Sequence, residues 1–145
     1  GISNNIMGTK NCIGVAIKAQ EMALEYVPQR ETFGAPLSTR QSIQWMLVDN
    51  DMDIKQSLWI TLEAAHKAQQ GEEFRKEAAM AKLAATEAGG RVVDRCMQMY
   101  GGLGVAKDLP FERWFRKMRI RRIGEGPSEV QRHVIARELL GSSLR

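Results

Sequence analysis

Apolar residues recur at helical spacing along almost the whole chain, and this periodicity is what most constrains its fold. Between residues 38 and 70, Ile43, Leu47, Ile54, Leu58 and Leu62 follow one another at intervals of four, seven, four and four residues. Such intervals place the side chains on one face of an amphipathic helix. No segment shows the apolar–polar alternation, bounded by turn residues, that marks paired strands. The sequence therefore predicts an all-α fold.

The same periodicity, together with the Gly and Pro positions, divides the chain into helices. We expect helices over residues 3–33, 38–70, 72–100, 110–118 and 127–140. Pro28 falls near the end of the first helix, where its missing N–H should kink or tighten the last turn. The last helix is expected to turn four apolar residues inward: Val130, Val134, Ile135 and Leu139. Four long helices and one short helix, at 110–118, predict an antiparallel four-helix bundle with one additional short helix in a single domain, residues 1–145.

Composition excludes several classes of protein. No run of 18 apolar residues is present, so we expect no membrane span. Two cysteines without CxxC spacing and two histidines give little support for a metal site, and we expect none. Residues 113–122 carry six Lys or Arg side chains, which would attract a phosphate-bearing partner or simply form a solvated helix face. Apolar residues interleave with these cations, as in a core-facing helix, so we expect no nucleic-acid binding.

The segment IGEGPSEVQR, residues 123–132, is the strongest candidate for chemistry. It places one carboxylate, Glu125, between two glycines and just before a Pro-Ser helix start. Glycine lets backbone and ligand approach closely, and a helix N-terminus offers unpaired N–H groups. A solvated turn would explain the same residues, so the segment gains weight only beside other candidates.

Two further segments have residues suited to a nucleotide-like ligand. RETFG, at 30–34, joins an arginine, whose planar fork suits a pyrophosphate, to an aromatic ring. QMYGGLG, at 98–104, combines an amide that can donate and accept hydrogen bonds with backbone freed by glycine. It lacks the strand–loop–helix setting of a Rossmann fingerprint.

Together these segments resemble the acyl-CoA dehydrogenase family, specifically its C-terminal helical domain. The resemblance covers nearly the whole chain and rests on RETFGAPLSTRQSIQ at 30–44, CMQMYGGLG at 96–104 and FERWFRKMRIRRIGEGPSEVQRHVIARELL at 111–140. It implies a flavoprotein that desaturates a fatty acyl-CoA between its α and β carbons, as in fatty acid β-oxidation. Electrons then pass to an electron-transferring flavoprotein. It also implies a homo-oligomer, a dimer or tetramer.

The resemblance further implies roles for individual residues. Glu125 matches the catalytic base, and Gly126 matches the adjacent glycine that contacts substrate. The positions that match FAD contacts are Arg30, Thr32, Phe33, Gln41, Gln98, Gly101, Gly102, Ser128 and Glu129. In this family the contacts from 30–41 cross a subunit interface. We expect Glu125 to point into a cleft shared with the RETF and QMYGG segments.

The chain departs from the family pattern in a few places. Gly124 stands where many members carry an aromatic residue, Pro127 replaces a common threonine, and Asn5 falls where many members carry an arginine. Family enzymes also have an N-terminal helical domain and a middle β-domain, which 145 helical residues do not include. We therefore expect this chain alone to be inactive.

Two questions stay open at the level of sequence. A non-catalytic oligomerisation module derived from the same family is the alternative to an enzyme. The compartment expected is the cytoplasm in a bacterium or archaeon and the mitochondrial matrix in a eukaryote, rather than the cell exterior.

Overall fold

Five α-helices account for most of residues 2–144, the part of the chain that the structure describes. The structure, a computed structural model, describes residues 2–144, with side chains from residue 6 onward. The helices are α1 (Ile2–Tyr26), α2 (Gln41–Gln69), α3 (Arg75–Tyr100), α4 (Phe111–Arg121) and α5 (Ser128–Leu140). Short 3₁₀ turns follow at Leu37–Thr39, Gly101–Val105 and Gly141–Leu144. The all-α prediction is confirmed.

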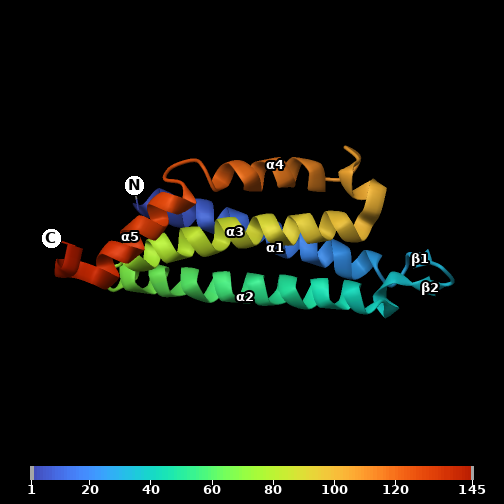
Figure 1. The fold of residues 1–145 in the computed structure, drawn as a ribbon, viewed down its shortest axis with the longest axis horizontal. Coiled ribbons are helices and arrows are strands. Elements are labelled where there is room, and N and C mark those ends of the chain that lie inside the picture. Colours follow the sequence, from blue (N-terminus) through green and yellow to red (C-terminus); the bar gives the residue numbers. More distant parts are fainter. Residues whose placement is uncertain (1, 145) are drawn as a thin grey trace.

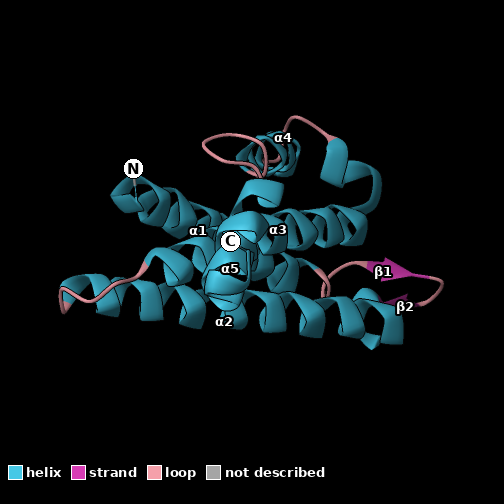
Figure 2. Cartoon of the chain, turned by 60° about the vertical axis from the view of Figure 1, so that its left-hand side comes forward, coloured by secondary structure: helices cyan, strands magenta, loops and turns pink. Residues whose placement is uncertain are grey.

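The helices α1, α2 and α3 lie side by side, and each runs opposite to the one before it (Figure 1). The helix α4 returns along α3, while α5 lies across the end of the bundle near the N-terminus (Figures 1 and 2). Because α3 packs against all four other helices, it is the central element of the fold. The other four helices are therefore all positioned by their contacts with α3.

The additional short helix, α4, contributes large side chains to the core of the bundle. Phe111 and Met118 of α4 are fully buried in the core. In contrast, the only described residues of α5 that are buried are Ser128 and Gln131. Val130 is half exposed and Leu139 is 68% exposed, so the predicted inner face of the last helix is wrong at these positions.

Small residues let α3 pack closely against its neighbours. Cys12, Ala16 and Ala19 of α1 meet a face of α3 that includes Val92 and Val93. A Cβ added at Gly89 would lie 2.9 Å from the Met118 sulfur, so the glycine leaves room for this side chain of α4. Close packing of this kind maximises the dispersion contacts of a narrow core.

A hairpin replaces the last part of the predicted first helix. That helix was expected to reach residue 33, but α1 ends at Tyr26, because Pro28 has no N–H and disfavours helix in the residue before it. The strands β1 (Glu31–Thr32) and β2 (Ala35–Pro36) then pair antiparallel. Phe33 and Gly34 both have positive φ, 51° and 82°. Two consecutive residues of this kind form the tight turn of a two-residue hairpin.

An aromatic stack fixes the α1 and α3 ends from which this hairpin projects. The rings of Tyr26 and Tyr100 stack with centroids 4.0 Å apart, and Phe111 tilts against Tyr100 at 4.7 Å. The Tyr100 hydroxyl also donates a hydrogen bond to the Met22 carbonyl at 3.0 Å. The base of the hairpin is therefore well anchored, although its tip is not.

Polar contacts join α2 to α3 halfway along the bundle. Asp53 accepts hydrogen bonds from Arg91 at 2.9 and 3.0 Å and from Arg95 at 2.7 Å. The buried Asn50 side chain accepts from Arg95 at 3.2 Å and donates to Gln20 of α1 at 3.0 Å. These bonds fix the register of the three long helices.

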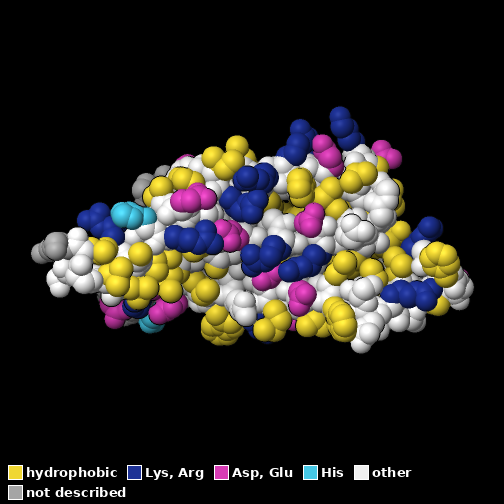
Figure 3. Space-filling view, in the orientation of Figure 1, with side chains coloured by type: hydrophobic (Ala, Val, Ile, Leu, Met, Phe, Trp, Pro, Cys, Tyr) yellow, Lys and Arg dark blue, Asp and Glu magenta, His cyan; other side chains and the backbone are white. Residues whose placement is uncertain are grey.

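The helix α2 has an apolar face that no other part of the described chain covers. Ile43, Leu47, Ile54 and Leu58 pack against the core as predicted, whereas Leu62 is exposed. On the remaining surface, large apolar side chains are more than half exposed: Trp45, Val48, Met52 and Trp59. Figure 3 shows apolar side chains gathered along the lower edge of the molecule, over α2. Contiguous apolar patches of this kind mark interaction surfaces.

Candidate functional site

The loop between α4 and α5 turns sharply at Glu125. The α4 end is closed by a hydrogen bond from the Gly124 N–H to the Ile120 carbonyl at 2.9 Å, and the Ser128 N–H donates to the Arg122 carbonyl at 3.1 Å. Glu125 itself has φ 54°, and Gly126 has φ 93°. A left-handed residue other than glycine costs of order 1–3 kcal/mol and persists where surrounding contacts impose it. Glu125 is thus held in a strained conformation.

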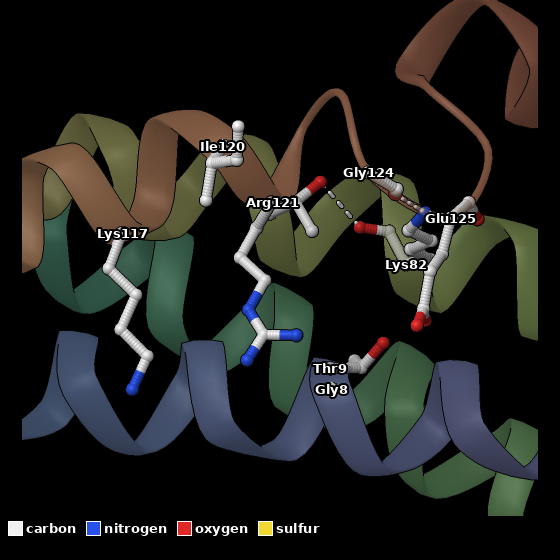
Figure 4. A pocket seen from close by; sticks show the side chains of 9 residues that line it. Gly8, Thr9, Lys82, Lys117, Ile120, Arg121, Gly124 and Glu125 are labelled. Carbon is white, nitrogen blue, oxygen red and sulfur yellow. Dashed lines mark hydrogen bonds between the residues drawn. The ribbon is translucent and has the colours of Figure 1, made fainter.

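This strained loop forms one wall of a pocket of about 290 Å³. The pocket is lined by Gly8, Thr9, Lys82, Thr86, Lys117, Ile120, Arg121, Gly124 and Glu125. Figure 4 shows the Glu125 side chain pointing from the loop toward α1, where Thr9 lies, with Lys117 and Arg121 reaching from α4 in the same direction. The pocket therefore joins one exposed carboxylate to two cations across a groove between α1 and α4.

Lys82 of α3 holds this loop by hydrogen bonds to its backbone. Its ammonium donates to the carbonyls of Gly124, Glu125 and Gly126 at 2.7, 2.7 and 2.6 Å. Burial lowers the pKa of the Lys82 ammonium, and the Glu125 carboxylate acts in the opposite direction. Sequence reasoning missed this residue. The available signal was a lone lysine within the Ala-rich run AAMAKLAAT, most of whose other members face the core.

Ser128 and Glu129, expected to approach a cofactor, begin α5 directly after this loop. Ser128 is 8% exposed, and its hydroxyl has no hydrogen-bond partner within residues 6–144. A buried hydroxyl without a partner costs free energy, so the fold leaves it available to a ligand group or to another chain segment. The Glu129 side chain is exposed. Both residues thus lie beside Glu125 and Gly126.

The remaining predicted contacts gather at the other end of α3, around a cavity of about 420 Å³. Its walls include five of the expected residues: Arg30, Thr32, Gln98, Gly101 and Gly102. Tyr26, Tyr100 and Leu37 complete part of the lining. The structure therefore joins the RETF and QMYGG segments into one site, although the whole of α2 and most of α3 separate them along the chain.

Two expected residues of this group lie outside the cavity lining. Phe33 occupies the tip of the hairpin and is 102% exposed. Gln41 is the exposed first residue of α2. Neither side chain can serve a ligand enclosed by the described chain, but both can reach one that lies against its surface.

The expected single cleft is wrong for this chain. Glu125 is fixed to α3 at Lys82, whereas the second cavity includes Gln98, near the C-terminal end of the same helix. At the rise of an α-helix, Lys82 and Gln98 are separated by about 24 Å, beyond the reach of any side chain. Each pocket has its own lining, and the two share no residue. Asn5, noted above for its departure from the family pattern, lies outside the residues whose side chains are described.

Other kinds of site receive no support from the described part of the chain. Within it, no three His, Cys, Asp or Glu side chains are grouped so that they could bind a metal ion. Nor does any helix in residues 2–144 have the length and apolarity needed to span a bilayer.

Comparisons with known proteins agree with the fold. The mitochondrial short-chain specific acyl-CoA dehydrogenase of Bos taurus is 43% identical over 130 residues, 90% of this chain and 32% of that protein. The structure of butyryl-CoA dehydrogenase from Megasphaera elsdenii superposes with a TM-score of 0.92 at 36% identity, covering 96% of this chain and 36% of that one. An FAD complex of PigA gives a TM-score of 0.88 at 27% identity, over 90% of this chain and 34% of that one.

These relatives are much longer than the chain described here. It spans about a third of the length of the curated relatives that it matches. Residues 6–140 match the family described as acyl-CoA dehydrogenase, C-terminal domain. The chain therefore belongs to the acyl-CoA dehydrogenase family, of which it represents the C-terminal helical domain.

Proposed function

We propose that the complete protein is an FAD-dependent acyl-CoA dehydrogenase and that this chain supplies its catalytic base, Glu125. The observation that carries the proposal is the Glu125 carboxylate, which lines a pocket from a strained loop at the position expected of the family base. Membership of the family supports the reaction class. The substrate class is an acyl-CoA thioester.

Glu125 would remove the α-proton of the thioester. That proton is a very weak acid, so the carboxylate must be placed accurately and the thioester carbonyl must be polarised. Gly124 has no side chain that would hinder the approach of a substrate to the backbone beside Glu125. Gly126 is the proposed substrate contact, because it directly follows Glu125 and matches the family glycine that contacts substrate.

The residues present fit an FAD cofactor. The cavity at the hairpin end joins the Arg30 guanidinium, the Gln98 amide and the backbone of Gly101 and Gly102, a donor set suited to a pyrophosphate and its sugar. FAD would accept the hydride from the β carbon, a redox step that no side chain can perform. The proposed contacts at this end are Arg30, Thr32, Phe33, Gln41, Gln98, Gly101 and Gly102, whereas Ser128 and Glu129 lie near Glu125.

The separation of the two sites supports a homo-oligomer. Because the hairpin end is about 24 Å from the Lys82 position along α3, we propose that it contacts the flavin of a second copy. The exposed face of α2, with two tryptophans, offers an apolar surface for such assembly. A dimer or tetramer would thereby complete each flavin site.

Other features of the complete protein follow from the same proposal. We propose an electron-transferring flavoprotein as its electron acceptor and fatty acid β-oxidation as the type of pathway. The proposed compartment is the cytoplasm of a bacterium or archaeon, or the mitochondrial matrix of a eukaryote. We also propose that this domain is inactive without the segments that cover the flavin in its longer relatives.

Replacing the base tests the proposal directly. In the complete protein, Glu125→Gln should reduce turnover of a short-chain acyl-CoA about 10³-fold, because amides do not accept the α-proton. Flavin absorbance should be unchanged. Glu138→Gln, an exposed site on α5, is the matched control and should retain activity. Undiminished turnover by the Glu125 variant would show that another group is the base.

A flavin measurement separates the enzyme from the alternative. If the complete protein is purified without bound FAD and takes up none, the non-catalytic oligomerisation module becomes the better description.

A further inference from the structure

The ammonium group of Lys82 has an unusual environment. The residue is 7% exposed. All three of its N–H donors can be used by the carbonyls of three consecutive residues, 124 to 126. Within residues 6–144 no carboxylate lies at ion-pair distance from it. A buried lysine normally requires an anionic partner or several aligned dipoles. Here the loop carbonyls fill that role.

The loop conformation explains why these three carbonyls converge. Glu125 and Gly126 are consecutive left-handed residues, with φ of 54° and 93°. Their backbone directs the carbonyl oxygens of residues 124–126 inward to Lys82 and leaves the Glu125 side chain free to point into the pocket (Figure 4). The position of the carboxylate and the three hydrogen bonds are therefore two results of one backbone conformation.

Further hydrogen bonds join this loop to its immediate neighbours in the sequence. Gly124 is bonded back to Ile120, and the Gln131 amide donates to the Gly126 carbonyl at 3.1 Å. Both partners belong to α4 or α5 and would move with the loop. Lys82, 42 to 44 residues away in the sequence, supplies bonds from the central helix of the bundle.

We infer that Lys82 is a positioning residue for the base: it holds residues 124–126 in the left-handed conformation that aims Glu125 into the pocket. It would not touch substrate or exchange a proton with it. The inference rests on the proposed role of Glu125. Since displacement of a catalytic group by about 1 Å can reduce a rate by about 10²-fold, loss of the ammonium should affect catalysis more than binding.

The test uses the complete protein with Lys82→Met, which keeps most of the stem and removes all three donors. Maximal turnover should fall about 100-fold. The dissociation constant of a non-reacting acyl-CoA thioether, followed through the flavin spectrum, should change by less than about threefold, because this ligand needs no proton removal. Lys67→Met is the matched control: Lys67 joins α2 to Glu77 of α3 at 2.9 Å but does not touch the loop. Its turnover should stay at the wild-type value.

A second variant covers the case in which Lys82→Met does not fold. Lys82→Gln keeps two N–H donors and should fold with an intermediate loss of about tenfold in turnover. Lys82→Arg, with its planar fork, should restore turnover only in part, since it cannot place three donors as the ammonium does. Wild-type turnover in Lys82→Gln, or in a folded Lys82→Met protein, would overturn the inference.

Hydrogen exchange makes the result independent of activity. Amides of residues 124–126 should exchange at least about tenfold faster in the folded Lys82 variants, while those in the middle of α5 keep their wild-type rates. If wild-type protein does not oxidise acyl-CoA, the proposed function fails. Faster exchange in the variants would still show that Lys82 holds residues 124–126. If wild-type protein is active but loop exchange and turnover are unchanged in the variants, only the inference about Lys82 fails.

Discussion

The two ends of α3 present their functional residues in opposite ways. At the α4–α5 loop, the chain fixes its own carboxylate through Lys82 and through bonds within the loop. At the hairpin, Phe33 is fully exposed and Arg30 and Gln41 lie on the surface. The first region is preorganised by the fold, whereas the second leaves its residues exposed. On the roles proposed above, the base is fixed before substrate arrives, and the cofactor contacts are completed by assembly.

A pair of glycine variants tests the contrast most strongly. Gly126→Ala should lower the free energy of unfolding by about 3 kcal/mol, and Gly34→Ala by about 1 kcal/mol. Both glycines have positive φ, but a Cβ at Gly126 would lie 2.7 Å from the Gln131 amide nitrogen, whereas one at Gly34 meets nothing within 4 Å. Urea denaturation of both variants measures the difference. Equal losses would contradict the view that only the loop is packed.

The exposed aromatic at the hairpin tip should matter for flavin and not for stability. Phe33→Ala should change the free energy of unfolding by less than about 0.5 kcal/mol. In the complete protein the same change should weaken FAD binding about fivefold, because a ring that stacks on a ligand contributes about 1 kcal/mol. Leu139→Ala, another exposed apolar site, is the control for nonspecific effects. A destabilised Phe33 variant with normal flavin affinity would reverse the assignment.

Removing the polar contacts of Asp53 tests whether the two ends of α3 loosen together. Asp53→Asn should cost about 1 kcal/mol at pH 7. Burial raises the pKa of the Asp53 carboxyl, but hydrogen bonds from Arg91 and Arg95 outweigh it and hold that pKa below its ordinary 3.8. A lowered folded-state pKa stabilises the fold above the unfolded-state pKa, and this contribution is lost as pH falls through the folded-state value.

The stability difference between wild type and Asp53→Asn should therefore be complete at neutral pH, begin to fall near the ordinary pKa and disappear below the lower folded-state pKa. Hydrogen exchange should rise similarly at residues 98–102 and 124–126, because Asp53 braces the middle of the bundle. A response confined to one end would show that the ends loosen independently.

The smallest expected difference is between the reaction rates of the two cysteines, Cys12 and Cys96. Both are buried, and burial raises the pKa of Cys96 to about 12 and that of Cys12 above its ordinary value. Neither thiol should react with a disulfide reagent at pH 8 until the bundle opens, and their rates should agree within about threefold. Single Cys→Ser variants separate the two signals. Rapid reaction of one cysteine alone would mean local opening at its end of the core.

The local sequence pattern was sufficient to predict the helices, but not the hairpin or which side chains of the last helix are buried. Periodicity depends on neighbours three and four positions apart, and it located the helix ends within about three residues except at the end of α1, which stops at Tyr26 rather than at residue 33. It missed the hairpin, whose strands have only two residues each and whose turn, Phe33-Gly34, lacks the usual Asn or Asp. It also misjudged α5, because apolar residues such as Leu139 remain exposed on this chain.

The candidate site shows the same limit. Glu125 was a candidate because it lies between two glycines before a helix start, and the resemblance predicted its role as a base. The second cavity does join the RETF and QMYGG segments as one site. Lys82 could not be found from local spacing, because its bonds join residues 42 to 44 positions apart. The expectation of one cleft was wrong because α3 separates the Glu125 loop from the RETF and QMYGG segments. The order of motifs in the sequence does not give their distances in space.

The exposed face of α2 gives the protein an optical reporter of the proposed assembly. Two of its three tryptophans, Trp45 and Trp59, lie on that face, whereas Trp114 packs edge-on against Phe111. Covering the α2 face would shift the emission of the two exposed indoles to shorter wavelength, and dilution that separates the copies would reverse the shift. Fluorescence of the unlabelled protein can therefore follow association at concentrations where scattering methods lose sensitivity.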